Sequence, residues 1–310
     1  MILIVNLNLA VDHIVEVDGL RAGEVQRSRG ARQQAGGKGV NVARVLKTLG
    51  ERSLLLGFSG GRAGDLIAAG LRAEKIASLL TRVREESRTC LVINDRERRE
   101  QTVINAPGAT VADAEWRDFE ATYTREIPHA ELVVINGSLP PNLPEDTYAR
   151  LTTAARDAGS RVLLDCASAP LSRALGARPF LVKINAPEAA ELLGAPVEDF
   201  PTAARAARRV RELGAENVMI TLGAQGATLD LAGARYRFVA PQVRSVNSVG
   251  SGDAAMAGLA AALRRGLTAE EAGALAVAAG AANSLHGAGG CSATEIEELR
   301  PRVRCEAEEF

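Results

Sequence analysis

The sequence predicts an α/β fold in which a doubly wound, mostly parallel sheet is flanked by helices. Short apolar runs that are typical of buried strands alternate with segments of helical period. One such helical segment has an apolar stripe that includes Val42 and Leu46 and ends at Gly50. After Gly252 we expect an almost entirely helical chain. The predicted strands lie at residues 1–5, 53–57, 132–136, 161–165, 181–184 and 218–222.

Two stretches interrupt this alternation and predict a small second sheet. Residues 11–34 contain short alternating segments joined by glycine-containing turns. Residues 88–106 predict a β-hairpin around a polar turn at 95–100. A sheet built from these two stretches and projecting over a crevice would be a lid or a dimer surface of one domain that spans residues 1–310.

Composition narrows the classes of function. The 310 residues carry a net charge of −1 and are 46% hydrophobic, which is enough for a substantial core. This charge balance argues against nucleic acid or a membrane as the main partner and favours a small molecule. Four well-separated cysteines and three histidines indicate neither a zinc site nor a disulfide framework. Residues 1–5 are too short an apolar run for a signal peptide or membrane span, so we expect a cytoplasmic protein.

The strongest chemical signal is a glycine-rich segment at residues 247–258, directly before an apolar helical stretch. Gly250, Ser251 and Gly252 predict a turn whose backbone N–H groups converge on an anion, and the helix start adds positive partial charge. Such a turn would hold a migrating phosphoryl group while Asp253 accepts a proton from a substrate hydroxyl. In isolation, the motif is also explained by an Asp that only stabilises the helix start.

A second glycine-rich loop, at residues 35–43, precedes another predicted helix and contains Lys38. Its glycines allow the backbone to approach a ligand closely, and the lysine supplies a positive charge. The loop is not a Walker A motif, because Arg32 stands in place of the first glycine and Gly39 replaces the Ser or Thr after the lysine. The alternative is a flexible loop with a solvated lysine.

Two weaker motifs follow predicted strands. Asn185 and Glu188 share one face of a helix start, where they could hold Mg²⁺ through water, or simply provide good helix capping. The segment at residues 221–227 is either a ligand loop outside a strand end or a tight turn. The sequence has no GxGxxG after its first strand and no recognisable Ser-His-Asp triad, which disfavours nicotinamide-dependent and Ser-hydrolase chemistry.

The order of these motifs along the chain resembles that of the PfkB, or ribokinase-like, carbohydrate kinases. The matching segments are AGGKGVNVA at 35–43, NGSLPP at 136–141, KINAPE at 183–188, TLGAQGA at 221–227 and NSVGSGDAAMAG at 247–258. With Asn6 to Asp12 they cover essentially the whole chain. The resemblance implies a doubly wound sheet, a β-sheet lid that often forms a homodimer contact, and the use of ATP and Mg²⁺, with a monovalent cation as a further option.

The resemblance also implies roles for individual residues. Asp253 is similar to the catalytic base of the family, and Gly250, Ser251 and Gly252 are similar to its anion hole. Sugar-site positions are matched by Asp12, Gly37, Lys38 and Asn41. Nucleotide-site positions are matched by Lys183, Asn185, Thr221, Gly223, Gly226, Gly252 and Asn283, and the metal-associated pair by Asn185 and Glu188.

Within the family, Asn247 and the GGKG loop resemble the branch of 1-phosphofructokinases and tagatose-6-phosphate kinases, which implies an activity of the 1-phosphofructokinase, 6-phosphofructokinase or tagatose-6-phosphate kinase type. This implies ATP-dependent phosphorylation of a sugar-phosphate hydroxyl, with Lys38 and Arg88 as cations for the phosphate that does not react. The chain departs from that branch where Cys90 and Val92 replace two polar residues after Arg88.

Three lid arginines, Arg29, Arg98 and Arg99, are candidates to compensate for this loss of polar contacts. Two other readings stay open at this point. One is a kinase of an unphosphorylated hexose or a nucleoside, and the other is a non-catalytic sugar-binding protein on the same scaffold.

Overall fold

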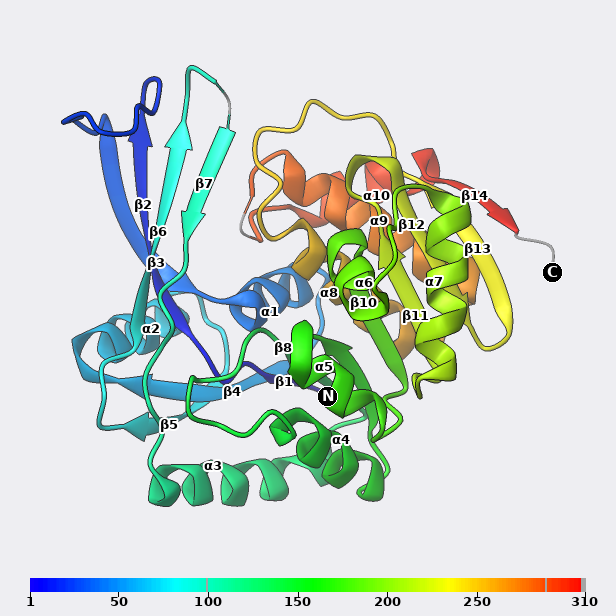
Figure 1. Ribbon diagram of the computed structural model, residues 1–310, viewed down its shortest axis with the longest axis horizontal. Coiled ribbons are helices and arrows are strands. Elements are labelled where there is room, and N and C mark those ends of the chain that lie inside the picture. Colours follow the sequence, from blue (N-terminus) through cyan, green and yellow to red (C-terminus); the bar gives the residue numbers. More distant parts are fainter. Residues whose placement is uncertain (99, 288, 308–310) are drawn as a thin grey trace.

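The computed structural model describes residues 1–98, 100–287 and 289–307. Its centre is a ten-stranded sheet with the order β14-β13-β12-β11-β10-β9-β8-β1-β4-β5 (Figure 1). The strands are β1 (Ile2–Val5), β4 (Ser53–Gly60), β5 (Ser78–Val83), β8 (Leu132–Asn136), β9 (Arg161–Asp165), β10 (Leu181–Asn185), β11 (Asn217–Thr221), β12 (Gly226–Leu231), β13 (Ala234–Val239) and β14 (Arg304–Ala307). All pairings from β5 to β11 are parallel, and those from β11 to β14 are antiparallel.

Helices cover both faces of this sheet, because alternate side chains of each strand point to opposite sides. Ile2 and Ile4 belong to one apolar cluster, and Leu3 and Val5 belong to the other. The first cluster includes α1 (Lys38–Thr48), α2 (Gly61–Ala73), α8 (Ser251–Arg264), α9 (Ala269–Ser284) and α10 (Ala293–Leu299). The second includes α3 (Asp113–Glu126), α4 (Thr147–Asp157), α5 (Ser168–Leu175), α6 (Ala186–Leu193) and α7 (Phe200–Glu212). The predicted doubly wound sheet is therefore confirmed.

The two edges of the central sheet differ from the expectation. Strand β5 was not predicted, and β12 to β14 form an antiparallel edge. The expectation of an almost entirely helical chain after Gly252 is wrong at β14, whose side chains are exposed or half-buried. A short edge strand of this kind lacks the continuous apolar run that marks a buried strand.

The small second sheet is also confirmed, with the order β3-β2-β6-β7. It projects from the rest of the chain at the upper left of Figure 1. Its strands are β2 (Ala10–Val17), β3 (Gly30–Gly36), β6 (Arg88–Asp95) and β7 (Glu100–Ile104). Because Ala10 pairs with Arg88 and Ile14 with Arg32, the side chains of Asp12, Arg32 and Arg88 lie on one face of this sheet.

Across the described parts of the chain, we find no helix that combines the length and the apolar character needed to cross a bilayer.

Candidate active site

The polar residues of the candidate site follow the carboxyl ends of the parallel strands. Asn6 follows β1, and Asn136, Asp165 and Asn185 end β8, β9 and β10. Because these strands run in the same direction, their ends meet at one edge of the sheet, which is where open α/β folds bind ligands. The helices α1 and α8 begin at this same edge, after the two glycine-rich loops.

Asp165 joins two lysines that come from different elements, Lys38 at the start of α1 and Lys183 in β10. Its Oδ1 accepts a hydrogen bond from Lys38 Nζ at 2.7 Å and its Oδ2 accepts one from Lys183 Nζ at 2.6 Å. The Asp165 side chain is inaccessible to solvent and that of Lys183 is 3% exposed. Burial disfavours the carboxylate, but the two lysines outweigh it and lower the pKa of Asp165 to about 2.

Lys38 is the more accessible of the two lysines, with 36% of its side chain exposed. Its Nζ also lies 3.6 Å from Glu188 Oε1. Burial opposes the charge on this ammonium group, but the carboxylates of Asp165, Asp253 and Glu188 together raise its pKa. The alternative of a solvated lysine is therefore not realised, because Lys38 forms ion pairs inside the site.

Asp253 lies in the first turn of α8, and its side chain is directed into the protein rather than into solvent. The residue is 6% exposed, and its Oδ2 accepts a hydrogen bond from Asn41 Nδ2 at 2.8 Å. Burial raises the pKa of Asp253 to about 6, with Asp165 adding to the effect and Lys38 opposing it. A carboxyl group whose pKa lies near neutrality is suited to accept a proton from a hydroxyl.

The loop before Asp253 has the geometry that its glycines predict. Gly250 caps α8 with a left-handed backbone, at φ 81°. A Cβ atom on Gly252 would lie 3.1 Å from Lys183 Nζ, so this helix start and the buried lysine are in close contact. The backbone N–H groups at the start of α8 therefore face a cationic neighbourhood that suits an anion.

The side chain of Asn283, on α9, forms hydrogen bonds with the glycine loop before Asp253. Its Nδ2 donates to the Val249 carbonyl at 2.9 Å and to Ser251 Oγ at 3.1 Å, and its Oδ1 accepts from the Gly289 N–H at 2.7 Å. The residue is fully buried. Within the described residues these contacts occupy both ends of the amide, so Asn283 supports the glycine loop, and its predicted place beside an adenine stays a prediction.

Asn185 and Glu188 form a reciprocal capping box at the start of α6. Glu188 Oε2 accepts from the Asn185 N–H at 2.9 Å, and Asn185 Oδ1 accepts from the Glu188 N–H at 2.8 Å. The capping alternative is therefore realised. In the described part of the chain, no three His, Cys, Asp or Glu side chains are grouped to hold a metal ion. Glu188 Oε1, beside Lys38, is the oxygen of this pair that remains for a metal.

The first glycine-rich loop is shaped by two polar side chains. A Cβ atom on Gly36 would lie 2.3 Å from the carboxylate of Asp12, so any other residue there would displace the Asp12 side chain. Gly37 adopts φ 116°, and the Gly39 N–H donates to Asn6 Oδ1 at 3.0 Å. Burial raises the pKa of Asp12.

Arg88 reaches the same region from the small sheet. It donates to the Asn8 carbonyl through Nε at 3.2 Å and Nη2 at 2.9 Å, and to the Ala106 carbonyl through Nη1 at 3.1 Å. These acceptors are neutral, and no carboxylate of the described residues forms an ion pair with Arg88. Its positive charge acts on Asp12, where it partly opposes the rise in pKa that burial causes.

The segment at residues 221–227 forms a 3₁₀ turn between β11 and β12. Gly226 has φ 127°, and a Cβ atom there would lie 1.8 Å from the Phe238 carbonyl oxygen. The turn alternative therefore explains Gly226, although Thr221 and Gly223 still lie at a strand end beside the site. Their contact with a nucleotide stays a prediction.

The two residues of the small sheet that replace polar residues of the related branch are apolar and buried. Cys90 and Val92 are 2% and 6% exposed. Among the compensating arginines, Arg29 is paired with Asp18 at 2.6 Å and Arg98 lies 3.8 Å from Asp95. Arg99 lies outside the described residues.

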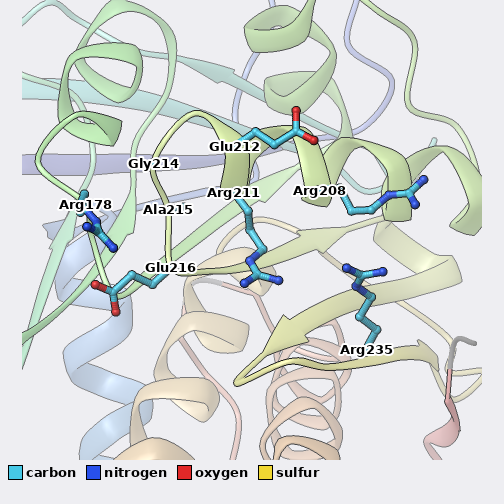
Figure 2. A pocket seen from close by; sticks show the side chains of 8 residues that line it. All are labelled: Arg178, Arg208, Arg211, Glu212, Gly214, Ala215, Glu216 and Arg235. Carbon is cyan, nitrogen blue, oxygen red and sulfur yellow. The ribbon is translucent and has the colours of Figure 1, made fainter. Parts of the chain in front are cut away.

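A hollow of about 640 Å³ lies elsewhere, beside the amino ends of β10 and β11 (Figure 2). Four arginines are among its lining residues, and two of them, Arg211 and Arg235, are paired with the buried Asp230. None of the candidate site residues lines it.

Sequence reasoning missed three contributors to the site. Asp165 was not among the predicted site residues, although its position at the end of a buried strand is a usable signal. Asn6 was quoted in a motif without a role, and its Nδ2 is buried without a hydrogen-bond partner among the described residues. Arg44 gave no signal, because the partners that anchor it, Glu74 and Ala35, come from other elements.

A doubly wound sheet with a glycine loop and a buried acid at a helix start, all at the carboxyl edge, defines a kinase of the ribokinase-like class. The chain belongs to the pfkB family of carbohydrate kinases, whose family model matches residues 2–295. The predicted family and enzyme class are thus confirmed, and such a kinase uses ATP as its phosphoryl donor.

Individual relatives agree with this assignment. The chain is 33% identical over 304 residues to a 1-phosphofructokinase of Bacillus subtilis, covering 98% of this chain and 99% of that protein. It is 38% identical over 264 residues to a 1-phosphofructokinase of Xanthomonas campestris, covering 84% and 83%. The tetrameric inhibited form of phosphofructokinase-2 from Escherichia coli superposes with a TM-score of 0.90 at 27% identity, covering 97% and 98%.

Proposed function

We propose that this kinase transfers the γ-phosphoryl group of ATP to a hydroxyl of a sugar phosphate, with Asp253 as the general base. The observation that carries the proposal is the placement of Asp253. It is buried at the start of α8, beside the glycine loop and near Lys38 and Lys183, and its pKa is raised to about 6. At neutral pH it is mostly ionised, so it can accept the hydroxyl proton as the new O–P bond forms.

Groups that are already in place can stabilise the negative charge that develops during phosphoryl transfer. The N–H groups of Gly250, Ser251 and Gly252 begin α8, where the helix adds positive partial charge. Lys183 lies against Gly252, and Lys38 is 36% exposed and still able to move toward a phosphate. Thr221 and Gly223 at the end of β11 extend the nucleotide side.

Mg²⁺ bound with ATP would neutralise its phosphate oxygens. The chain offers Glu188 Oε1 for this ion, through water, whereas the other capping-box oxygens are already hydrogen-bonded. A monovalent cation is a further candidate, because a potassium complex of phosphofructokinase-2 is among the similar structures.

A phosphorylated acceptor is supported by the names of the relatives and by the charge on Arg88. Its guanidinium group shares a face with Asp12 and Arg32 and lacks a carboxylate partner among the residues described. Arginine at such a position is suited to hold a phosphate. The alternative, a neutral hexose or a nucleoside as acceptor, is favoured by the apolar Cys90 and Val92.

The small sheet is proposed as a lid on a single domain that spans residues 1–310, and as the contact surface of a homodimer. Val103 and Ile104 on β7 are 37% and 56% exposed, which suits burial against a second copy. We further place the enzyme in the cytoplasm, because all four cysteines are free thiols.

A panel of acceptors tests the proposal. Phosphorylation is measured with fructose 1-phosphate, fructose 6-phosphate, tagatose 6-phosphate and unphosphorylated hexoses. Arg88→Ala is expected to raise KM for the preferred phosphosugar at least about tenfold more than KM for its neutral analogue, because one charged hydrogen bond is lost. Arg84→Ala, an exposed arginine four residues earlier, is the matched control and should change neither. Equal effects of Arg88→Ala on both acceptors would favour the neutral-sugar alternative.

A further inference from the structure

The orientation of the Asn41 side chain is fixed from two sides. Its Nδ2 donates to Asp253 Oδ2 at 2.8 Å, and its Oδ1 accepts from Arg44 Nη1 at 3.1 Å. Asn41 and Arg44 lie three residues apart on α1, so their side chains are neighbours on the helix surface. Reversing the amide would place its oxygen against the Asp253 carboxylate and its NH₂ group against the guanidinium group, and both contacts would be repulsive.

Arg44 is itself held firmly. Its Nε donates to Glu74 Oε2 at 2.6 Å and its Nη2 donates to Glu74 Oε1 at 2.7 Å, a bidentate ion pair. Nη2 also donates to the Ala35 carbonyl at 2.7 Å, at the end of β3 directly before the glycine loop. The Arg44 side chain is only 12% exposed. A planar guanidinium group held by these three hydrogen bonds, one from Nε and two from Nη2, has little freedom to rotate away from Asn41.

Glu74 caps the C-terminus of α2, outside both glycine-rich segments, and is not among the residues that the sequence predicted for the site. The chain of contacts therefore runs from α2 through Arg44 and Asn41 on α1 to Asp253 on α8. Glu74 neutralises Arg44, so the influence of Arg44 on Asp253 is exerted through geometry more than through net charge.

We infer that Arg44, anchored by Glu74, is a positioning residue that keeps the Asn41 amide turned with its NH₂ group toward Asp253. This inference rests on the proposed role of Asp253 as the base. The hydrogen bond from Asn41 favours the ionised carboxylate and occupies Oδ2, which leaves Oδ1 for the hydroxyl of the acceptor. The other charged groups that act on Asp253 are Lys38 from α1, Lys183 from β10 and Asp165 from β9.

Losing Arg44 would free the amide to reverse once Asp253 is protonated, so that the Asn41 oxygen accepts a hydrogen bond from the carboxyl group. The base would then hold its proton to higher pH, because its neutral form has gained a hydrogen bond that Arg44 prevents in the wild type. Binding of ATP would be little changed, because Asn41, Glu74 and Ala35, the partners of Arg44 described above, are not among the residues proposed for the nucleotide.

The test measures kcat against pH for the wild type, Arg44→Met, Asp253→Asn and the double variant. We expect Arg44→Met to move the acid limb up by about one pH unit, and therefore to lower kcat about twofold at pH 7 and about tenfold at pH 5, with KM for ATP unchanged. In the Asp253→Asn background, Arg44→Met should have no further effect on kcat. Glu74→Gln should move the limb in the same direction by a smaller amount, and it carries the test if Arg44→Met does not fold. Arg72→Ala, an exposed arginine on α2, is the control.

The inference is overturned if the acid limb does not move in Arg44→Met and Glu74→Gln. It is also overturned if the losses of kcat from Arg44→Met and Asp253→Asn add fully in the double variant. Either result would leave Arg44 a structural residue. Failure of the proposed function gives a different result. In that case Asp253→Asn alone keeps near-normal turnover, whatever the Arg44 variant does.

Discussion

Asn41 donates a hydrogen bond to the carboxylate of Asp253 at 2.8 Å, although 212 residues separate the two in the chain. The contact joins the glycine loop of α1 to that of α8, so the two parts of the site that would bind sugar and phosphate are held together by one side-chain pair. Their relative position sets where an acceptor hydroxyl meets the transferring phosphoryl group.

The raised pKa of Asp253 predicts an acid limb in the rate profile. Below about pH 6 the carboxyl group is protonated and cannot accept the hydroxyl proton, so kcat should fall about tenfold per pH unit. Lys38→Met should move this limb upward, because Lys38 stabilises the ionised form. Steady-state kinetics between pH 4.5 and 8.5 checks both expectations, and a limb near pH 4 in the wild type would show that burial does not raise the pKa.

Asp253 should also lower the stability of the fold at neutral pH. Its folded pKa of about 6 exceeds the usual 3.8, so the stability contributed by its protonated form is complete below pH 3.8 and is lost as the pH rises through 6. Asp253→Asn removes the buried charge and should raise the free energy of unfolding at pH 8 by on the order of 1–3 kcal/mol. Urea unfolding at pH 8 and pH 5 measures this, and the gain should be smaller at pH 5. A variant less stable than the wild type at pH 8 contradicts the expectation.

The buried Asp165 predicts the opposite dependence on pH. Its pKa is lowered to about 2, so its stabilising contribution is present above pH 3.8 and disappears as the pH falls toward 2. Asp165→Asn leaves Lys183 buried without its partner and should destabilise the fold by about 3–5 kcal/mol at pH 7.

Asp65→Asn is the matched control for Asp165→Asn. It breaks the exposed pair with Arg82, in which both side chains are more than half exposed, and it should change stability by less than about 1 kcal/mol. Thermal and chemical unfolding distinguish the two variants. Equal effects would mean that Asp165 is better hydrated than its burial indicates.

Much of the fold follows from local pattern. The strands predicted at residues 132–136 and 161–165 have the same bounds as β8 and β9, because fully buried parallel strands are continuous apolar runs. The edge strands β5 and β14 were missed because one side of an edge strand is open, so its sequence mixes polar and apolar residues.

The candidate site was predictable only where its chemistry is local. Asp253 and its three preceding residues are recognisable because a glycine turn and a helix start lie within a few positions of each other. Asp165 and Arg44 act through partners that are 127 and 30 residues away along the chain, in Lys38 and Glu74. No spacing rule in a single sequence relates such pairs, so their roles depend on the packing of separate elements.

The central claim is that Asp253 accepts the proton of the acceptor hydroxyl, and turnover of Asp253→Asn tests it most directly. This change keeps the size of the side chain and an acceptor oxygen for Asn41, so nucleotide binding and the fold should be retained. We predict that kcat falls roughly 10²-fold or more while the dissociation constant of ATP changes little. Near-normal turnover of a folded Asp253→Asn variant would contradict the account.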